Sequence, residues 1–155
     1  MTILSRLAVL AACAVSSGPA IAGECPADKV GVDVTNPASP EATMPKGLTD
    51  TVLSAIDLAK TNAQFAGYQI RIRKLTIEPG GVVPWHSHAD RPALIYIAQG
   101  EIDEYASNCS VPIVHKAGDL RRETSGTSHW WKNLSDHTVT LYVADVLHDK
   151  ADHNM

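Results

Sequence analysis

Residues 80–88 have the sequence GGVVPWHSH, which places His86 and His88 one residue apart shortly after two glycines. Side chains on a β-strand alternate between its two faces, so residues i and i+2 point the same way. On a strand, these two imidazoles would lie on one face, where both could bind one metal ion. The stretch therefore predicts a strand and part of a metal site.

A second stretch, GDLRRETSGTSHWWKN at residues 118–133, supplies a third candidate ligand, His129. The two stretches resemble the paired motifs of the cupin family, G-x5-H-x-H-x3,4-E-x6-G and G-x5-P-x-G-x2-H-x3-N. The matching positions are Gly80, His86, His88 and Gly100 in the first motif and Gly118, Gly126, His129 and Asn133 in the second. The resemblance covers residues 67–146 and implies a barrel in which the three histidines converge.

Two positions depart from the family pattern. Thr124 replaces the usual proline, and Ala93 stands where the family places a glutamate ligand. Three neutral imidazoles would leave a divalent ion its full charge, so we expect the centre to prefer an anionic ligand. Asp90 is an alternative fourth ligand; otherwise it is a solvated loop acid.

The expected cofactor is one divalent metal ion, because imidazole suits several transition metals. Fe, Zn, Mn, Ni and Cu all stay open. Three-histidine relatives include dioxygenases that use Fe(II), so the resemblance implies dioxygenase-like chemistry on a small anionic molecule. Isomerase or lyase chemistry, a non-catalytic binding protein for a metal or small ligand, and a barrel that has lost its metal are the alternatives.

Strand parity predicts the walls of a substrate pocket. If Ala93 faces the interior, Ile95 and Ile97 do so too, and Trp131 follows His129. These four residues are the expected pocket lining, with plain core packing as the alternative. Three arginines are candidates for guiding an anion to the mouth, and two further histidines are interpreted as surface residues: Arg91, Arg121, Arg122, His115 and His137.

The rest of the pattern predicts an all-β, double-sheet jelly-roll (cupin) barrel. Short alternating segments are separated by Gly, Pro, Asn or Ser. The expected strands are 68–77, 82–88, 93–99, 101–105, 111–115, 128–133 and 138–146. A change of phase near Arg73 and Lys74 predicts a bulge or a strand that switches between sheets. Residues 23–66 are expected to form an extended N-terminal arm, and residues 147–155 a tail. Apolar residues at helical spacing make 49–60 the candidate for one short helix in this arm, although residues 48–50 could equally be a boundary between a strand and a loop.

The first 22 residues have the features of a signal peptide. Residues 1–6 carry one positive charge, residues 7–15 are apolar, and Ala20 and Ala22 form an A-x-A cleavage site. Cleavage after Ala22 predicts a periplasmic or secreted protein. A lipoprotein attached at Cys13 is the less favoured alternative, since the apolar segment before it is short. That segment is also shorter than the ~20 residues of a membrane span, so no stable membrane insertion is expected.

The mature chain would retain two cysteines, Cys25 and Cys109. In an oxidising compartment such a pair predicts a disulfide, with two separate thiols as the alternative. The net charge of −4 and the absence of a basic run argue against nucleic-acid binding. The expected partner is a small-molecule ligand, and exposed sheet edges favour a homodimer.

Overall fold

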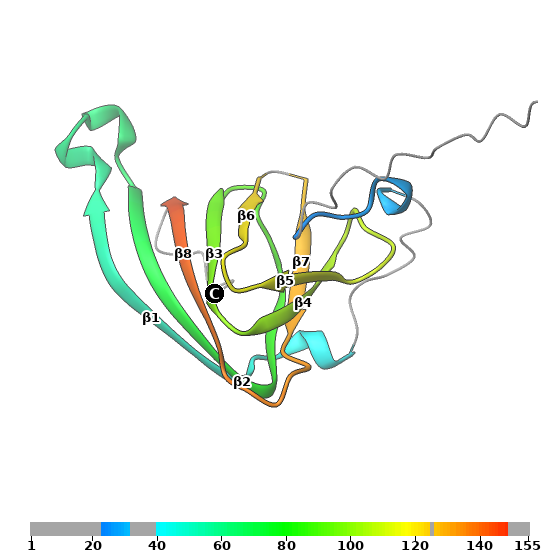
Figure 1. The fold of residues 1–155 in the computed structure, drawn as a ribbon. Helices are drawn as coiled ribbons and strands as arrows, with labels where there is room; N and C mark the ends of the chain where they lie inside the picture. Colours follow the sequence, from blue (N-terminus) through cyan, green and yellow to red (C-terminus); the bar gives the residue numbers. More distant parts are fainter. Residues whose placement is uncertain (1–22, 32–39, 125, 149–155) are drawn as a thin grey trace, which may run out of the picture.

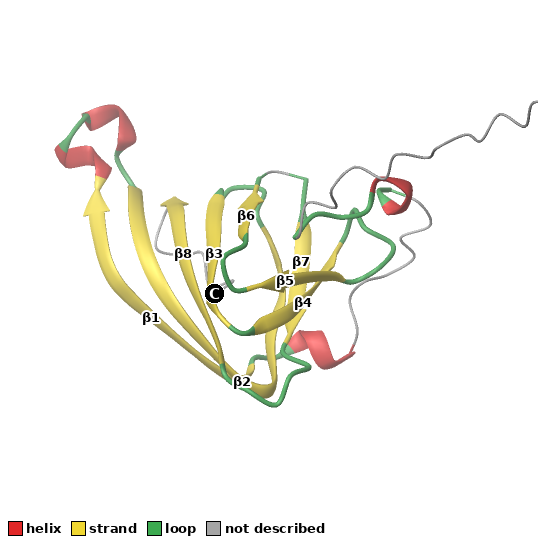
Figure 2. Cartoon of the chain, in the orientation of Figure 1, coloured by secondary structure: helices red, strands yellow, loops and turns green. Residues whose placement is uncertain are grey.

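The computed structural model describes residues 23–31, 40–124 and 126–148, which form an all-β fold. Figure 2 shows strands almost throughout, with short 3-10 helices between them. The strands are β1 Lys46–Asp57, β2 Tyr68–Ser87, β3 Ala93–Gln99, β4 Glu101–Ala106, β5 Ile113–Lys116, β6 Leu120–Glu123, β7 Ser128–Lys132 and β8 Val139–His148. The 3-10 helices are η1 Ala27–Lys29, η2 Pro40–Thr43, η3 Leu58–Lys60 and η4 Ala63–Phe65.

The strands form one curled antiparallel sheet in the order β5-β4-β7-β2-β8-β3-β6, with β1 also paired to β2. The first part of β2 pairs with β8 from Tyr68 to Ile77, whereas its last part pairs with β7 from Val82 to Ser87. β2 is therefore shared by two halves of the sheet, one with β7, β4 and β5 and the other with β8, β3 and β6. The sheet bends along β2 and curls around a buried interior (Figure 1). The expected jelly-roll fold is confirmed.

The break between the expected strands 68–77 and 82–88 is instead a distortion within the continuous strand β2. Gly80 has a φ of 70°, a conformation that favours glycine. A Cβ at Gly81 would lie 2.7 Å from both Glu78 O and Ile77 Cγ2. The two glycines therefore allow the chain to bend without breaking the strand, and this bend leads directly to His86.

The helix expected at residues 49–60 is wrong, because most of this segment is strand β1. Its partners run along β2 from Val82 to Gln69, and only Leu58–Lys60 forms a 3-10 turn. Thr49, Thr51, Val52 and Ile56 are β-branched, which favours extended backbone. The helical spacing of apolar residues was a weaker signal than pairing along a neighbouring strand. The expected N-terminal arm thus contributes a strand to the sheet.

The expected bulge near Arg73 lies in the neighbouring strand instead. The register of β1 shifts between Val52 and Ser54, whereas β2 pairs with β8 without interruption from Tyr68 to Ile77. Regular alternation along β2 therefore points the side chain of Arg73 inward, together with those of Leu75 and Ile77. The side chains of Ile70 and Ile72 are 41% and 40% exposed. An arginine thus takes a place on the inner face of the sheet.

Buried aliphatic side chains from both halves of the sheet form the main core around Trp131. The cluster contains Leu75, Ile77, Val83, Ala93, Ile95, Ile97, Ile102, Trp131, Val139, Leu141 and Val143. Trp130 points to a smaller cluster and stacks on Tyr105, with ring centroids 4.2 Å apart. Trp130 and Trp131, which are neighbours on β7, therefore point to opposite faces of the sheet.

A disulfide joins Cys25 to Cys109 and ties residues 23–31 to the turn after β4. Backbone hydrogen bonds from Gly31 N to Asn108 O, at 2.9 Å, and from Ser110 N to Lys29 O, at 3.1 Å, hold the same contact. The expected signal peptide lies outside the described residues. No helix in the described part of the chain is long and apolar enough to span a membrane.

Candidate metal centre

Three histidines meet inside the curled sheet. His86 on β2 lies directly opposite His129 on β7, and His88 follows immediately after the end of β2. The Nε2 atoms are 3.1 Å apart for His86 and His88, 3.0 Å for His88 and His129, and 3.1 Å for His86 and His129. All three side chains are buried. The structure thus brings together the three residues that the motifs single out.

The Nδ1 atom of each histidine has its own partner. In His86 it lies 2.8 Å from Pro84 O, and in His88 2.8 Å from Arg91 O. In His129 it lies 2.7 Å from Oε1 of Glu104. Carbonyl and carboxylate oxygens accept hydrogen bonds, so Nδ1 carries the proton and donates it. A neutral imidazole then leaves Nε2 with a lone pair.

The three Nε2 lone pairs therefore face one another within 3.1 Å. Trp131 Nε1 donates one weak hydrogen bond to Nε2 of His129 at 3.4 Å. Facing lone pairs repel unless a cation lies between them. Nitrogens bound to one ion at about 2.1 Å, with angles of about 90–110°, lie roughly 3.0–3.4 Å apart. The spacing and the tautomers both fit a metal ion held by Nε2 atoms.

Burial also keeps His86 and His88 neutral. It lowers the pKa of His86 well below its ordinary value, helped by the nearby His129. Burial, again with His129, lowers the pKa of His88 to about 4. Neutral imidazole is the form that binds metal, so little proton competition is expected near neutral pH.

Behind His129 lies a buried network around Glu104, whose side chain has no exposed surface. Its Oε2 accepts from Nε2 of His115 at 2.7 Å, and Arg121 Nε lies 3.1 Å away. Burial opposes ionisation of Glu104, but the hydrogen bonds from His115 and His129 outweigh it and lower its pKa. The carboxylate of Glu104 therefore stays charged. It contacts the candidate ligand His129 and not the metal site itself.

Glu123 joins this network from β6. Its Oε1 accepts from Arg121 Nε at 2.8 Å and lies 3.3 Å from Nδ1 of His129. Burial raises the pKa of Glu123. Ligand-type atoms of Glu104, Glu123 and His129 also lie within 4.8 Å of one another. Since Arg121 and the Nδ1 proton already occupy this space, this second cluster is an ion-pair network.

Beside the histidines lies a small, largely apolar cavity of about 20 Å³. This volume suits a water molecule or a ligand of a few atoms. The residues that line it are Arg73, Leu75, Val83, His86, His88, Ile95, Trp131, Leu141 and Val143. Two of the four expected pocket residues, Ile95 and Trp131, are among them. Ala93 and Ile97 are buried in the core but do not line the cavity.

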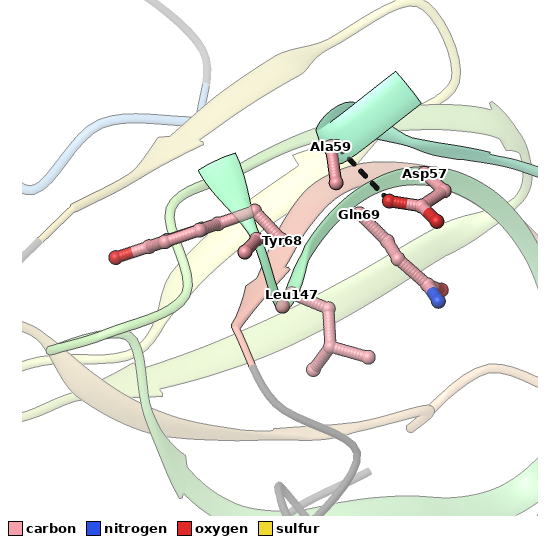
Figure 3. A pocket seen from close by; sticks show the side chains of 7 residues that line it. Asp57, Ala59, Tyr68, Gln69 and Leu147 are labelled. Atoms are coloured by element: carbon pink, nitrogen blue, oxygen red, sulfur yellow. Dashed lines mark hydrogen bonds between the residues drawn. The ribbon is translucent and has the colours of Figure 1, made fainter. Parts of the chain in front are cut away.

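A larger hollow, of about 320 Å³, lies where β1, β2 and β8 meet the 3-10 turns (Figure 3). Asp57, the acidic residue among those that line this hollow, accepts a hydrogen bond from the backbone N–H of Ala59 at 3.0 Å. Figure 3 labels Ala59, Tyr68, Gln69 and Leu147 beside Asp57 around it. Because the described part of this hollow offers no cluster of ligand-type groups, the histidine centre is the better candidate site.

Comparison with known proteins agrees with this geometry. The family profile described as "Cupin domain" matches residues 73–145, a range that contains all three histidines. The chain carries a cupin domain. No curated protein matches its sequence.

Two solved structures illustrate the shared fold. The cupin domain of Schizosaccharomyces pombe Cnp3 is 15% identical, with a TM-score of 0.53 over 72% of each chain. A recombinant oxalate oxidase in complex with glycolate is 20% identical, with a TM-score of 0.51 over 72% of this chain and 59% of that one. At these identities the likeness concerns the fold alone.

Within this cupin domain several residues lie elsewhere than the sequence suggested. Asp90 is exposed and is not part of the histidine cluster. The surface interpretation of His115 is wrong, because it is fully buried and stacks on Trp131, with ring centroids 4.6 Å apart. His137 is exposed as expected. Of the three candidate arginines, Arg91 and Arg121 are buried in ion pairs, and Arg122 is exposed.

Sequence reasoning missed Glu104 and Arg73 as residues of the site. Glu104 lies on β4, opposite Trp131 of β7, which places it beside His129. Its position two residues after Ile102, which is 1% exposed, was a signal that its side chain points inward. Arg73 had the corresponding signal two residues before Leu75.

Proposed function

We propose that this cupin domain binds one divalent metal ion through Nε2 of His86, His88 and His129, and uses it to act on a small anionic molecule. The dioxygenase-like version of this function takes Fe(II) as the metal. The observation that carries the proposal is the convergence of three Nε2 lone pairs whose Nδ1 partners fix them toward one point. Such an arrangement holds a cation and leaves further coordination positions open.

The protein's own groups have distinct parts in this function. Pro84 O, Arg91 O and Glu104 orient the three imidazoles through their Nδ1 atoms. Ile95 and Trp131 keep the cavity apolar. A bound divalent ion would supply Lewis acidity for an anion or a water molecule. Because the walls are apolar, charge interactions inside should be stronger than in water.

A non-catalytic role is the second candidate, and the size of the cavity favours it. A space of about 20 Å³ beside the histidines admits only a few atoms. A protein that stores or senses a metal needs no larger space, whereas a catalyst for a larger substrate would have to open. Oxygen reactivity of the metal-loaded protein separates the two candidates.

We also propose that the protein acts outside the cytoplasm. The Cys25–Cys109 disulfide supports this location, since such bonds persist in oxidising compartments. Fractionation of cells, with N-terminal sequencing of the mature protein, tests both export and cleavage after Ala22. A protein recovered in the cytoplasm with an intact N-terminus would contradict the proposal.

Metal analysis of the protein purified from its native compartment tests the central proposal. We expect close to one metal ion per chain, and iron would favour the dioxygenase version over zinc, manganese or nickel chemistry. His129→Ala should lose most of the metal, whereas His137→Ala, at an exposed position, should keep it. Full metal content in a folded His129→Ala variant would overturn the assignment.

A further inference from the structure

We infer that Arg73 and the metal centre together bind one small carboxylate-type anion in the cavity that they share. This inference rests on the proposed metal site and names the ligand that the site would take. Arg73, His86 and His88 all line the same cavity, and the other lining residues shown there are apolar. The cationic side chain of Arg73 is therefore the anion-binding group of this wall.

Arg73 is held in place by two carboxylates. Its Nη1 pairs with Asp50, and its Nη2 lies 3.3 Å from Oδ2 of Asp145. Asp145 is shared with Arg71, which it contacts through both oxygens at 2.8 Å. The guanidinium is thus fixed before any ligand arrives, which reduces the entropy cost of binding.

One donor of this guanidinium has no acceptor among the residues that the structure describes. The side chain is 4% exposed, and its buried Nε makes no hydrogen bond with any of them. An unsatisfied buried donor costs about 1–3 kcal/mol, so native proteins rarely keep one without a reason. An anion in the cavity would supply the missing acceptor.

The number of free donors and the space restrict the ligand. Nε is the Arg73 nitrogen for which the structure shows no acceptor, and its single N–H can hold one oxygen of the anion while the metal takes another. A carboxylate carries two oxygens on one carbon and fits this division. The cavity of about 20 Å³ admits formate more readily than any ring-bearing acid.

The inference is tested by titrating cobalt(II)-loaded protein with formate and following the visible spectrum. Formate should change the spectrum of the unaltered protein, and benzoate should not at the same concentration. Arg73→Gln should weaken formate binding roughly tenfold or more, the loss expected for one charge-assisted hydrogen bond. Arg73→Lys retains the charge but not the Nε donor, and should weaken binding by a smaller factor.

Arg71→Gln is the matched control. Arg71 also pairs with Asp145 but does not line the cavity, so its loss should change formate affinity less than twofold. Cobalt content is measured for every variant. If the unaltered protein holds no metal, the proposed function fails; if metal is held and Arg73→Gln binds formate as tightly as the parent, only the inference fails. Should the Arg73 variants not fold, a crystal structure of the unaltered cobalt protein with formate decides, and formate away from Arg73 Nε would overturn the inference.

Discussion

The Nδ1 atom of His129 lies 2.7 Å from Oε1 of Glu104, a carboxylate with no exposed surface. The cupin motif of this chain lacks its glutamate ligand, because Ala93 occupies that position. Glu104 places a negative charge behind a ligand instead of on the metal. The sequence-based expectation of a centre made only of neutral imidazoles therefore overstates its positive charge.

Glu104→Gln should reduce metal affinity by about 10- to 100-fold, the usual cost of removing a partner that orients a metal-bound histidine. An amide oxygen can accept from His129 or from His115, but the amide N–H₂ would then face a donor. Competition with a coloured chelator measures the affinity. Glu101→Gln, whose parent side chain is 51% exposed, is the control and should bind like the parent. Equal affinities in both variants would show that Glu104 does not support the site.

Ala93→Glu tests the departure from the family motif. Ala93 is 5% exposed and pairs with Glu123 on one side and Asp145 on the other, so the new carboxylate would join two buried ones. Without metal, we expect a loss of about 3–5 kcal/mol in unfolding free energy, as for an uncompensated buried charge.

Metal should recover more stability in Ala93→Glu than in the parent if the new carboxylate becomes a ligand. Formate should bind more weakly to that variant, because the added negative charge repels an anion. Thermal unfolding with and without cobalt measures the first effect, and Ala93→Gln controls for side-chain volume. A metal-induced gain no larger than that of the parent would mean that residue 93 does not face the metal.

The metal-free protein should lose stability on acidification before its carboxylates titrate. The folded-state pKa of His88 is about 4, against 6.5 for the free side chain, and that of His86 is also lowered. Between these values the unfolded chain binds more protons, so the free energy of unfolding should fall as the pH drops from 6.5 to about 4. Each pKa unit corresponds to about 1.4 kcal/mol.

Chemical denaturation of the metal-free protein at several pH values measures this dependence. His88→Gln removes one titrating group and should make the decline shallower. A parent protein equally stable at pH 7 and pH 5 would argue that the histidines are not neutral in the folded state.

The disulfide should contribute to stability because it closes a loop over a sequence separation of 84 residues. Cys25→Ser with Cys109→Ser is expected to cost roughly 2–4 kcal/mol in unfolding free energy. The matched control is the unfolding free energy of the parent protein, measured with and without reductant. Two free thiols in the non-reduced mature protein would contradict this pairing.

The sequence by itself determined the elements that depend on local spacing. The i, i+2 relation of His86 and His88 and the glycines before them follow from strand geometry and from the backbone freedom of glycine. The alternation at residues 93–97 likewise predicted which side chains point inward. These features need no knowledge of distant parts of the chain.

Only the tertiary structure decided which distant groups meet. Pairing of β4 with β7 brings Glu104 to His129, and regular pairing of β2 with β8 turns Arg73 into the interior. In the sequence both look like surface residues, since charged side chains are seldom buried without partners. Their partners lie on other strands, so the register of the closed sheet fixes the ion pairs, the burial of His115 and the strand conformation of residues 46–57.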